Sequence, residues 1–291
     1  MDIATWINKN TLSLAGKTVA ISGATGGIGQ ELCRHLVSLG AHLVLLDRNQ
    51  NKSLALANSL RALSPSLSIQ RIALDLEDIA QVKQAARQLE ALPIDVLILN
   101  AGIYQVPRRK CATGLDNVFQ VNFASPYYLV RTLLPHLNSR GGKVVAVGSI
   151  AHTNSPTDRD DVDFSTRDKS SLVYGNSKRF LMYALYGLYD GKPGLAITHP
   201  GITLTNISAH HPPFIFNLIK HPMKVIFMEP KKAALPILRG VFEDCGRNEW
   251  IGPGWFDIWG WPTKRRLGSC PKDEAKWIFE QAEKIYQEMK K

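Results

Sequence analysis

Short apolar runs recur along the chain and alternate with longer stretches in which apolar residues repeat at helical spacing. The first run, Lys17–Ser22, predicts a buried strand bounded by glycines. A helix is predicted over Gly27–Leu39, because Leu32 and Leu36 share one helical face and Gly40 follows as a terminator. Further buried strands are predicted at Ala41–Leu46, Ile69–Leu74, Val96–Leu99, Lys143–Val147 and Leu195–Thr198.

This alternation of strands and helices predicts an α/β fold. Parallel strands are joined by crossovers that cover both faces of the sheet, and right-handed crossovers make the sheet doubly wound. We therefore predict a single-domain, doubly wound parallel sheet of the Rossmann type, with helices on both faces and a C-terminal substrate-loop extension. Residues 1–15 form an N-terminal extension in this interpretation, and residues 16–291 form the domain.

Two segments interrupt the alternation. Thr153–Ser170 is polar and acidic and predicts a loop inserted between the fifth strand and its helix. Ser208–Met228 is largely apolar, and long excursions from a compact sheet often serve as lids or binding loops. We expect a substrate lid at about residues 206–230, followed by a C-terminal segment 231–291, with Phe214 and Phe216 lining the substrate.

Composition is that of an ordinary globular protein, with 45% apolar and 21% charged residues. No window approaches the ~18 unbroken apolar residues that span a bilayer, which argues against a transmembrane enzyme. The N-terminus lacks the basic region and apolar run of a secretory signal, so a cytoplasmic protein is expected. The four cysteines are scattered without metal-ligand spacing, so we expect reduced thiols and no metal site.

The charge balance is basic, with 35 Lys and Arg against 25 Asp and Glu, a net charge of +10. The excess is dispersed in short clusters that do not define a groove, which argues against nucleic acid as a partner. A solvated basic surface is the favoured interpretation, and weak contact with a membrane surface is an alternative.

A glycine-rich turn lies directly between the first strand and the first helix. Glycines there let the chain turn sharply and let its backbone approach a pyrophosphate, while the helix N-terminus supplies free N–H groups. The spacing of Gly23, Gly27 and Gly29 predicts a phosphate-binding turn that opens a strand-helix-strand unit. The residues of this turn expected to bind the cofactor are Ser22, Gly23, Thr25, Gly27, Ile28 and Gly29.

Asp47 and Arg48 follow the second strand and favour opposite cofactors. A carboxylate at this position can accept both ribose hydroxyls of NAD(H) but repels the 2′-phosphate of NADP(H). An arginine can pair with that phosphate, or it can stack on the adenine of either cofactor. We favour NAD(H), with NADP(H) as the alternative.

Tyr174 and Lys178 stand four residues apart and share one face of a predicted helix. A free tyrosine is a poor acid-base catalyst at neutral pH, and a nearby ammonium favours its phenolate. The pair is therefore a candidate proton donor and acceptor. Alone the spacing is a weak signal, but here it follows a strand that ends at Ser149.

Taken together, these motifs resemble the short-chain dehydrogenase/reductase family over about residues 15–290, because Asp75-Leu76 and Asn100-Ala101-Gly102 also stand in that family's order. The resemblance implies that Asp75 contacts the adenine, although a helix N-cap is an alternative role for Asp75. It implies that the turn from Asn100 to Gly102 shapes the cofactor crevice. The resemblance also implies that Leu76, next to Asp75, contacts the cofactor.

The same resemblance implies further roles. Ser149, Tyr174 and Lys178 are the catalytic residues, and Tyr174 and Lys178 also contact the cofactor. Asn122 holds a proton-relay water and bends a helix. The Pro200-Gly201 turn leads to Thr205, which binds the nicotinamide carboxamide, with Thr203 as the alternative register.

Within the family, the sequence is most similar to the retinol dehydrogenase-like and WW-domain-oxidoreductase-like branch. The similarity rests on the stretch from Ser149 to His152, the segment Asp161–Phe164 and the tail Ile251–Trp255. It implies lipophilic substrates in a site lined by Ile150 and His152. A structural role is the alternative for His152.

We therefore predict an NAD(P)-dependent oxidoreductase that transfers hydride reversibly between nicotinamide and a small-molecule carbonyl or secondary alcohol, with Tyr174 as general acid and base. The resemblance also implies a homo-oligomer. Two alternatives belong to other classes: a non-catalytic dinucleotide-binding sensor or scaffold, and a peripheral membrane-associated protein.

Overall fold

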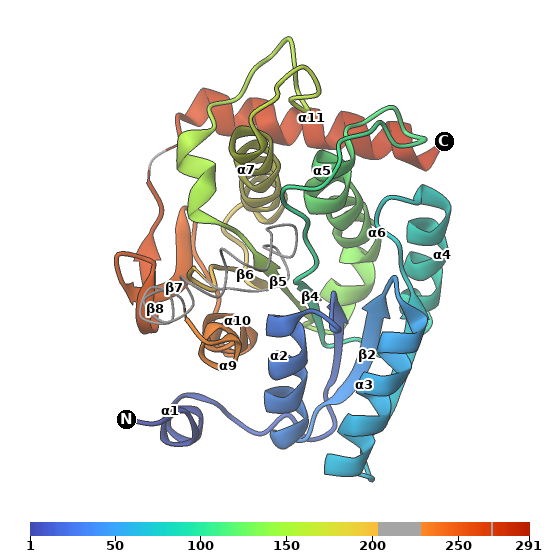
Figure 1. Cartoon of the computed structure of the whole chain (residues 1–291), viewed down its shortest axis with the longest axis vertical. Coiled ribbons are helices and arrows are strands. Elements are labelled where there is room, and N and C mark those ends of the chain that lie inside the picture. The colour runs from blue at the N-terminus through green and yellow to red at the C-terminus, as the bar shows by residue number, and fades with distance from the viewer. Residues whose placement is uncertain (203–227, 269) are drawn as a thin grey trace, which may run out of the picture.

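A computed structural model describes residues 1–202, 228–268 and 270–291 (Figure 1). These residues form one eight-stranded sheet in the order β3-β2-β1-β4-β5-β6-β7-β8. The strands are β1 (Thr18–Ser22), β2 (His42–Asp47), β3 (Ile69–Ala73), β4 (Val96–Leu99), β5 (Lys143–Val147), β6 (Leu195–Thr198), β7 (Glu249–Trp255) and β8 (Trp259–Arg266). Neighbouring strands are parallel from β3 to β7, and β8 alone of these eight runs antiparallel.

Helices cover both faces of the sheet because the side chains of each strand alternate between two apolar cores. In β1, Val19 and Ile21 join one core and Ala20 joins the other. The first core contains residues of α1 (Ile3–Asn10), α2 (Gly27–Ser38), α3 (Gln50–Leu63) and α10 (Leu235–Phe242). The second contains residues of α4 (Ile79–Glu90), α6 (Ser125–Ser139), α7 (Ser170–Tyr189) and α11 (Lys272–Lys290), which packs against α7 (Figure 1). The doubly wound α/β fold is thus confirmed.

The predicted strands up to β6 agree with the structure to within one residue at each end. The hairpin of β7 and β8 was not predicted, and it makes the sheet mixed rather than wholly parallel. Its strands carry Pro253 and Pro262 opposite each other. Proline lacks the N–H that a central strand needs, so its presence argues against a strand. Here Pro262 lies in the edge strand β8, and Pro253 lies beyond Ile251, the residue of β7 that pairs with β6.

The N-terminal extension packs onto the domain. Helix α1 begins after Asp2, whose carboxylate accepts a 2.7 Å hydrogen bond from the Thr5 amide. Trp6 is 2% exposed and stacks on Trp261 of β8, with ring centroids 6.3 Å apart. Residues of α1 therefore belong to the core that covers one face of the sheet.

The inserted segment Thr153–Ser170 contains the end of the 3-10 helix η2 (Ile150–Asn154) and then an irregular loop, as its composition predicts. Arg108 holds this loop: its guanidinium pairs with Asp116 at 2.6 Å and donates to the carbonyl oxygens of Arg167 and Phe164, at 2.6 and 2.8 Å. Arg108 thereby joins its own loop, which follows β4, to the inserted loop, which follows β5.

Helices long and apolar enough to cross a membrane are lacking in the described ranges 1–202, 228–268 and 270–291.

Candidate active site

The glycine turn joins β1 to α2 and has no room for side chains at its critical positions. Gly23 has a φ of +67°, and a Cβ there would lie 2.8 Å from the Cα of Ala101. A Cβ on Gly29 would lie 2.3 Å from the carbonyl oxygen of Gly23. The closely packed turn leaves the N-terminus of α2 directed at the neighbouring pocket, as a phosphate-binding turn requires.

Ser22 and Asn100 clamp this turn to the turn that follows β4 (Val96–Leu99). The Ser22 hydroxyl accepts hydrogen bonds from the amides of Asn100 and Ala101, at 3.1 and 3.2 Å. In return, the Asn100 side chain donates to the carbonyl oxygens of Ser22 and Gly23, at 3.2 and 3.0 Å. The two motifs read separately from the sequence therefore form one hydrogen-bonded unit.

A pocket of about 490 Å³ opens beside this unit, at the carboxyl ends of β1, β2, β3 and β4. It brings together the cofactor-binding residues predicted from the first part of the chain, namely Ser22, Gly23, Thr25, Gly27, Ile28, Gly29, Asp47, Arg48, Asp75, Leu76, Asn100, Ala101 and Gly102. An open α/β sheet binds ligands in such a crevice. Ligand contact by these residues stays a prediction.

Asp47 is buried and already hydrogen-bonded within the protein, which its sequence position does not indicate. It is 2% exposed, and its carboxylate accepts hydrogen bonds from the Thr25 amide and hydroxyl, at 3.0 and 3.1 Å, and from the Ser53 hydroxyl at 3.0 Å. The carboxylate thus ties the glycine turn to α3. About one of its four acceptor positions is left for a ligand, so the expectation that Asp47 accepts both ribose hydroxyls does not hold in this arrangement.

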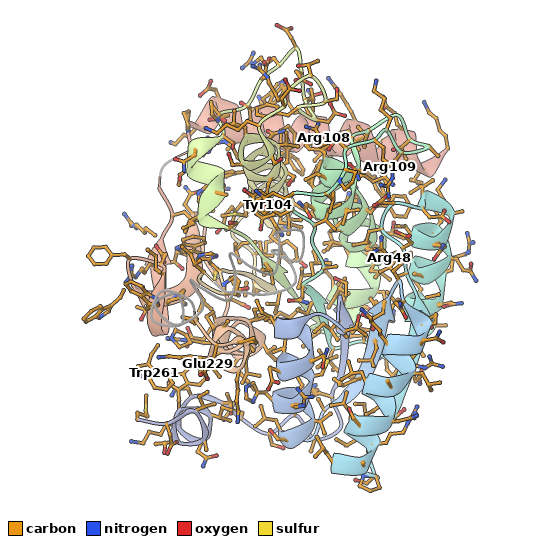
Figure 2. The ribbon with its side chains drawn as sticks, in the orientation of Figure 1. Arg48, Tyr104, Arg108, Arg109, Glu229 and Trp261 are labelled. Carbon is orange, nitrogen blue, oxygen red and sulfur yellow. The ribbon has the colours of Figure 1, made fainter. Side chains whose placement is uncertain are left out.

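The same end of the pocket carries exposed Arg48 and Lys52. Figure 2 shows Arg48 toward one side of the view and Tyr104 nearer its centre, and both line the pocket. Sequence reasoning missed Lys52. No spacing rule relates Lys52 to Arg48, because Arg48 precedes α3 and the two residues do not share a helical face.

Asp75 does not cap a helix, so that alternative is wrong. Helix α4 begins at Ile79, and Asp78 is its N-cap, with its carboxylate accepting from the Ala80 amide at 2.9 Å. Asp75 accepts from the Glu77 amide at 3.0 Å and lines the pocket. The side chain is therefore placed where a ligand can reach it.

Ser149, Tyr174 and Lys178 meet where β5 (Lys143–Val147) ends against α7. Lys178 is 2% exposed, and its ammonium donates to the Val147 carbonyl oxygen at 2.8 Å. The Lys178 nitrogen lies 5.8 Å from the centre of the Tyr174 ring. The expected common helical face is thus confirmed, and the lysine is fixed by the strand that carries the serine.

Burial sets the protonation of this pair. It raises the pKa of Tyr174 to about 12, the opposite of the lowering expected from Lys178; a hydrogen bond to the Ser149 side chain opposes the rise, and the neighbouring Tyr104 adds to it. Burial also lowers the pKa of Lys178 to about 8. At neutral pH the phenol holds its proton and the lysine is mostly charged, so the site can donate a proton.

Asn122 lies in the π-helical turn η1 (Gln120–Ala124), between α5 (Asn117–Phe119) and α6. Its side-chain oxygen accepts from the Ile103 amide at 2.8 Å, and its amide donates to the Ile103 carbonyl and the Ser177 hydroxyl, at 2.9 and 3.0 Å. A π turn is frequent at functional sites. The helix irregularity expected at Asn122 is present, and the residue joins the loop after β4 to α7.

Gly102 is needed beside this group. A Cβ there would lie 3.1 Å from the side-chain oxygen of Asn122 and 3.4 Å from the Lys178 nitrogen. The turn after β4 therefore passes directly over two of the predicted catalytic residues.

The Pro200-Gly201 turn follows β6 (Leu195–Thr198), as expected. Gly201 has a φ of +80°, and a Cβ there would lie 2.7 Å from the Ile258 carbonyl oxygen. The turn is thus packed beneath the end of the β7–β8 hairpin. Thr203, Thr205, Phe214 and Phe216 lie outside the described residues.

His152, predicted to line the substrate site, packs into the core, which matches the structural role that the sequence left as an alternative. His152 is 2% exposed, and its ring packs on Tyr183 and Trp250 while one nitrogen lies 2.7 Å from the Ser149 carbonyl oxygen. Burial lowers the pKa of His152, which keeps it neutral. The His152 ring thus packs between the core and the residues that follow β5. Ile150 is half-buried, packs against the core, and stays a candidate lining residue.

Tyr104 is a second residue that sequence reasoning missed. It lines the pocket, and its ring lies 5.1 Å from that of Tyr174, tilted by 56°. Nothing in the sequence distinguishes this tyrosine from others, because the contact depends on the fold. Groups of acidic, cysteine or histidine residues able to hold a metal ion are lacking in the described part of the chain.

Residues 17–158 match the sequence profile of the family described as short chain dehydrogenase. The short chain dehydrogenase macD of Penicillium terrestre is 33% identical over 242 residues, which cover 72% of this chain and 73% of that protein. Retinol dehydrogenase 12 of Mus musculus is 30% identical over 204 residues, which cover 68% of this chain and 65% of that protein. The chain spans only 42–63% of the length of three other curated relatives.

Solved structures share the fold. The crystal structure of an uncharacterized protein from Mycobacterium Paratuberculosis aligns with a TM-score of 0.72 over 96% of each chain, at 24% identity. A short-chain dehydrogenase from Sphingobium yanoikuyae, solved in complex with NADPH, aligns with a TM-score of 0.61 at 21% identity. That alignment covers 92% of this chain and 94% of the other.

Proposed function

The chain belongs to the short-chain dehydrogenase/reductase family, in its retinol dehydrogenase-like branch, and from this membership we propose that it is an NAD(P)-dependent oxidoreductase. Its reaction is reversible hydride transfer between a nicotinamide ring and the carbon of a carbonyl group or secondary alcohol. One observation carries the proposal: Ser149, Tyr174, Lys178 and Asn122 gather beside the pocket that the glycine turn lines.

In this assignment the pocket binds a dinucleotide, because its glycines allow the closely packed turn that leaves the N-terminus of α2 at the pocket. In this assignment the glycine turn holds the pyrophosphate, Asp75 and Leu76 hold the adenine, and Lys178 holds the nicotinamide ribose. Thr205 holds the carboxamide, with Thr203 as the alternative. When bound, the dinucleotide supplies or accepts the hydride. The NADPH complex of the structurally similar enzyme supports this cofactor class.

The chain's own residues position the substrate and move its proton. The hydroxyls of Ser149 and Tyr174 hold the carbonyl oxygen, and Tyr174 donates its proton to that oxygen as the alcohol forms. The buried ammonium of Lys178 stabilises the phenolate that remains, because charges interact strongly away from water. Asn122 holds the loop after β4 against α7. In this proposal it also holds the water through which the proton exchanges with solvent.

The finer assignments are NAD(H) as the preferred cofactor and a lipophilic substrate. The negative charge of Asp47, which repels a 2′-phosphate, supports NAD(H), and Arg48 and Lys52 are the opposing charges that line the same pocket. The apolar segment Ser208–Met228 and the relative named retinol dehydrogenase 12 support a lipophilic alcohol or carbonyl.

Replacing the phenol tests the assignment of Tyr174. Tyr174→Phe keeps the ring but cannot carry the proton, so we expect folding and dinucleotide binding to persist while kcat falls by about 10² or more. Steady-state kinetics with a ketone panel and a dinucleotide titration measure both. Near-wild-type turnover of this variant would remove Tyr174 from the mechanism.

A further inference from the structure

Helix α7 carries two pairs of residues with the same spacing, one at the site and one against the 3-10 helix η2. Tyr174 and Lys178 stand one helical turn apart at the site. Gly175 and Arg179 each follow one residue later, so they share a neighbouring face of the helix. A Cβ on Gly175 would overlap the carbonyl oxygen of Ala151, and η2 therefore packs directly on the backbone of α7.

The position of η2 decides where the hydroxyl of Ser149 lies. Ser149 is the N-cap of η2, and its hydroxyl oxygen accepts a hydrogen bond from the Ala151 amide at 3.2 Å. Its carbonyl oxygen lies 2.7 Å from a ring nitrogen of His152, which belongs to η2 as well. A shift of η2 along α7 therefore moves the Ser149 hydroxyl relative to that of Tyr174.

Arg179 holds η2 on α7, and a residue of α11 holds Arg179. Arg179 is 8% exposed, and its guanidinium donates to the His152 carbonyl oxygen at 3.2 Å. Two further guanidinium nitrogens bind both carboxylate oxygens of Glu274, in the first turn of α11, at 2.7 and 2.6 Å. Glu274 also accepts from the Thr157 hydroxyl of the inserted loop at 2.9 Å. A bidentate pair fixes the plane of the guanidinium, so the carboxylate on α11 orients the donor that binds η2.

We propose that Arg179 and Glu274 are positioning residues through which the C-terminal helix α11 sets the separation of the Ser149 and Tyr174 hydroxyls. This inference deepens the proposed function and rests on it. In that function both hydroxyls hold the carbonyl oxygen, and a displacement of about 1 Å in such a pair lowers a rate by up to about 10²-fold. Helix α11, which packs against α7 (Figure 1), thereby governs turnover through Arg179.

A second ion pair on α11 provides a matched control. Glu283 accepts hydrogen bonds from Arg131 at both carboxylate oxygens, at 3.0 and 3.2 Å, and from the Tyr127 hydroxyl at 2.6 Å. Both of these partners lie in α6. Glu283→Gln therefore weakens the attachment of α11 to the domain and leaves the contacts of Arg179 with η2 in place.

The test compares this control with two variants of the Arg179 pair. Glu274→Gln keeps the shape of the side chain, but it leaves a buried guanidinium without its counter-charge, which is destabilising. A double variant, Arg179→Met with Glu274→Leu, removes both charges together. Each protein is incubated in D₂O with NADH, and in parallel with NADPH, and mass spectrometry follows amide exchange in the peptide of residues 149–155. The same preparations give kcat for ketone reduction and the dissociation constant of the dinucleotide.

Both variants of the Arg179 pair should release η2 without altering the dinucleotide pocket. We expect amide exchange in residues 149–155 to become at least about 10-fold faster and kcat to fall about 10-fold or more. The dissociation constant of the dinucleotide should change less than about twofold, because the turns that line the pocket are untouched. Glu283→Gln should match the wild type in the exchange of this peptide and in kcat.

The outcomes separate positioning, general support of α11 and the function itself. Unchanged exchange of this peptide overturns the inference, as does faster exchange without a decrease in kcat; where Glu274→Gln does not fold, the double variant decides. An equal effect of Glu283→Gln also overturns it, because the Arg179 pair would then only hold α11 in place. If the wild type reduces no ketone but only the Arg179 pair controls exchange in this peptide, the positioning of Ser149 stands and the proposed function fails.

Discussion

Two titratable residues at the site have pKa values that burial moves in opposite directions. The pKa of Tyr174 rises to about 12 and that of Lys178 falls to about 8, because both charged forms lose contact with water. The protein thus keeps the phenol protonated and the lysine close to its own titration. This arrangement favours proton donation in carbonyl reduction at neutral pH.

The pH profile of reduction follows from these values. The lowered pKa of Lys178 means that its charge is present below about pH 8 and is lost above it, while Tyr174 keeps its proton until about pH 12. We expect kcat/KM for ketone reduction to be level near neutral pH and to decrease as pH rises through about 8. A profile that increases through this range would contradict the roles given to the pair.

Asp47 governs the choice of cofactor in our account. Asp47→Asn keeps an acceptor for the Thr25 amide, so the glycine turn is preserved while the negative charge is removed. We expect the wild type to have the higher kcat/KM with NAD(H), and the variant to lose about tenfold of that preference. A wild type that prefers NADP(H), unchanged by the substitution, would assign the site to Arg48 and Lys52.

At the level of elements, the sequence predicts what local chemistry decides. The strands from β1 to β6 are predicted by their apolar residues, and the glycine turn is predicted by glycines at positions where the structure leaves no room for a Cβ. The β7–β8 hairpin is not predicted, because Pro253 and Pro262 argue against strands except near the edge of a sheet, and the sequence does not reveal where that edge is. The burial of His152 was equally inaccessible, since it depends on packing with Trp250.

The glycine turn offers a direct test of its packing. In Gly29→Ala the new Cβ meets the backbone oxygens of Gly23 and Ala24 at 2.3 and 2.8 Å, and backbone cannot move aside cheaply. We expect a loss of about 1–3 kcal/mol in unfolding free energy and at least about tenfold weaker dinucleotide binding. Denaturant unfolding and a binding titration measure the two effects.

Gly268→Ala is the matched control, because nothing lies within 4 Å of a Cβ at that position. Its stability should stay within about 0.5 kcal/mol of the wild type, with binding unchanged. If both variants bound dinucleotide equally well, the glycine turn would not be the phosphate-binding turn.

On the scale of the whole molecule, the site is assembled from segments that lie far apart in the sequence. The turns after β1 and β4 are clamped by Ser22 and Asn100, and the loop after β4 is held to α7 by Asn122. Family resemblance could name the residues, but only the fold shows that Tyr104 joins them. Contacts of this kind depend on how loops from different strands meet, which no local pattern encodes.

The central claim is that the chain transfers hydride rather than only binding a dinucleotide. The most direct measurement is incubation of the protein with nicotinamide cofactor deuterated at C4 and a panel of lipophilic ketones, followed by mass spectrometry of the alcohols formed. We expect one deuterium on the carbinol carbon with the wild type and none above background with Tyr174→Phe. Saturable dinucleotide binding without deuterium transfer to any ketone would contradict the claim and indicate a non-catalytic sensor or scaffold.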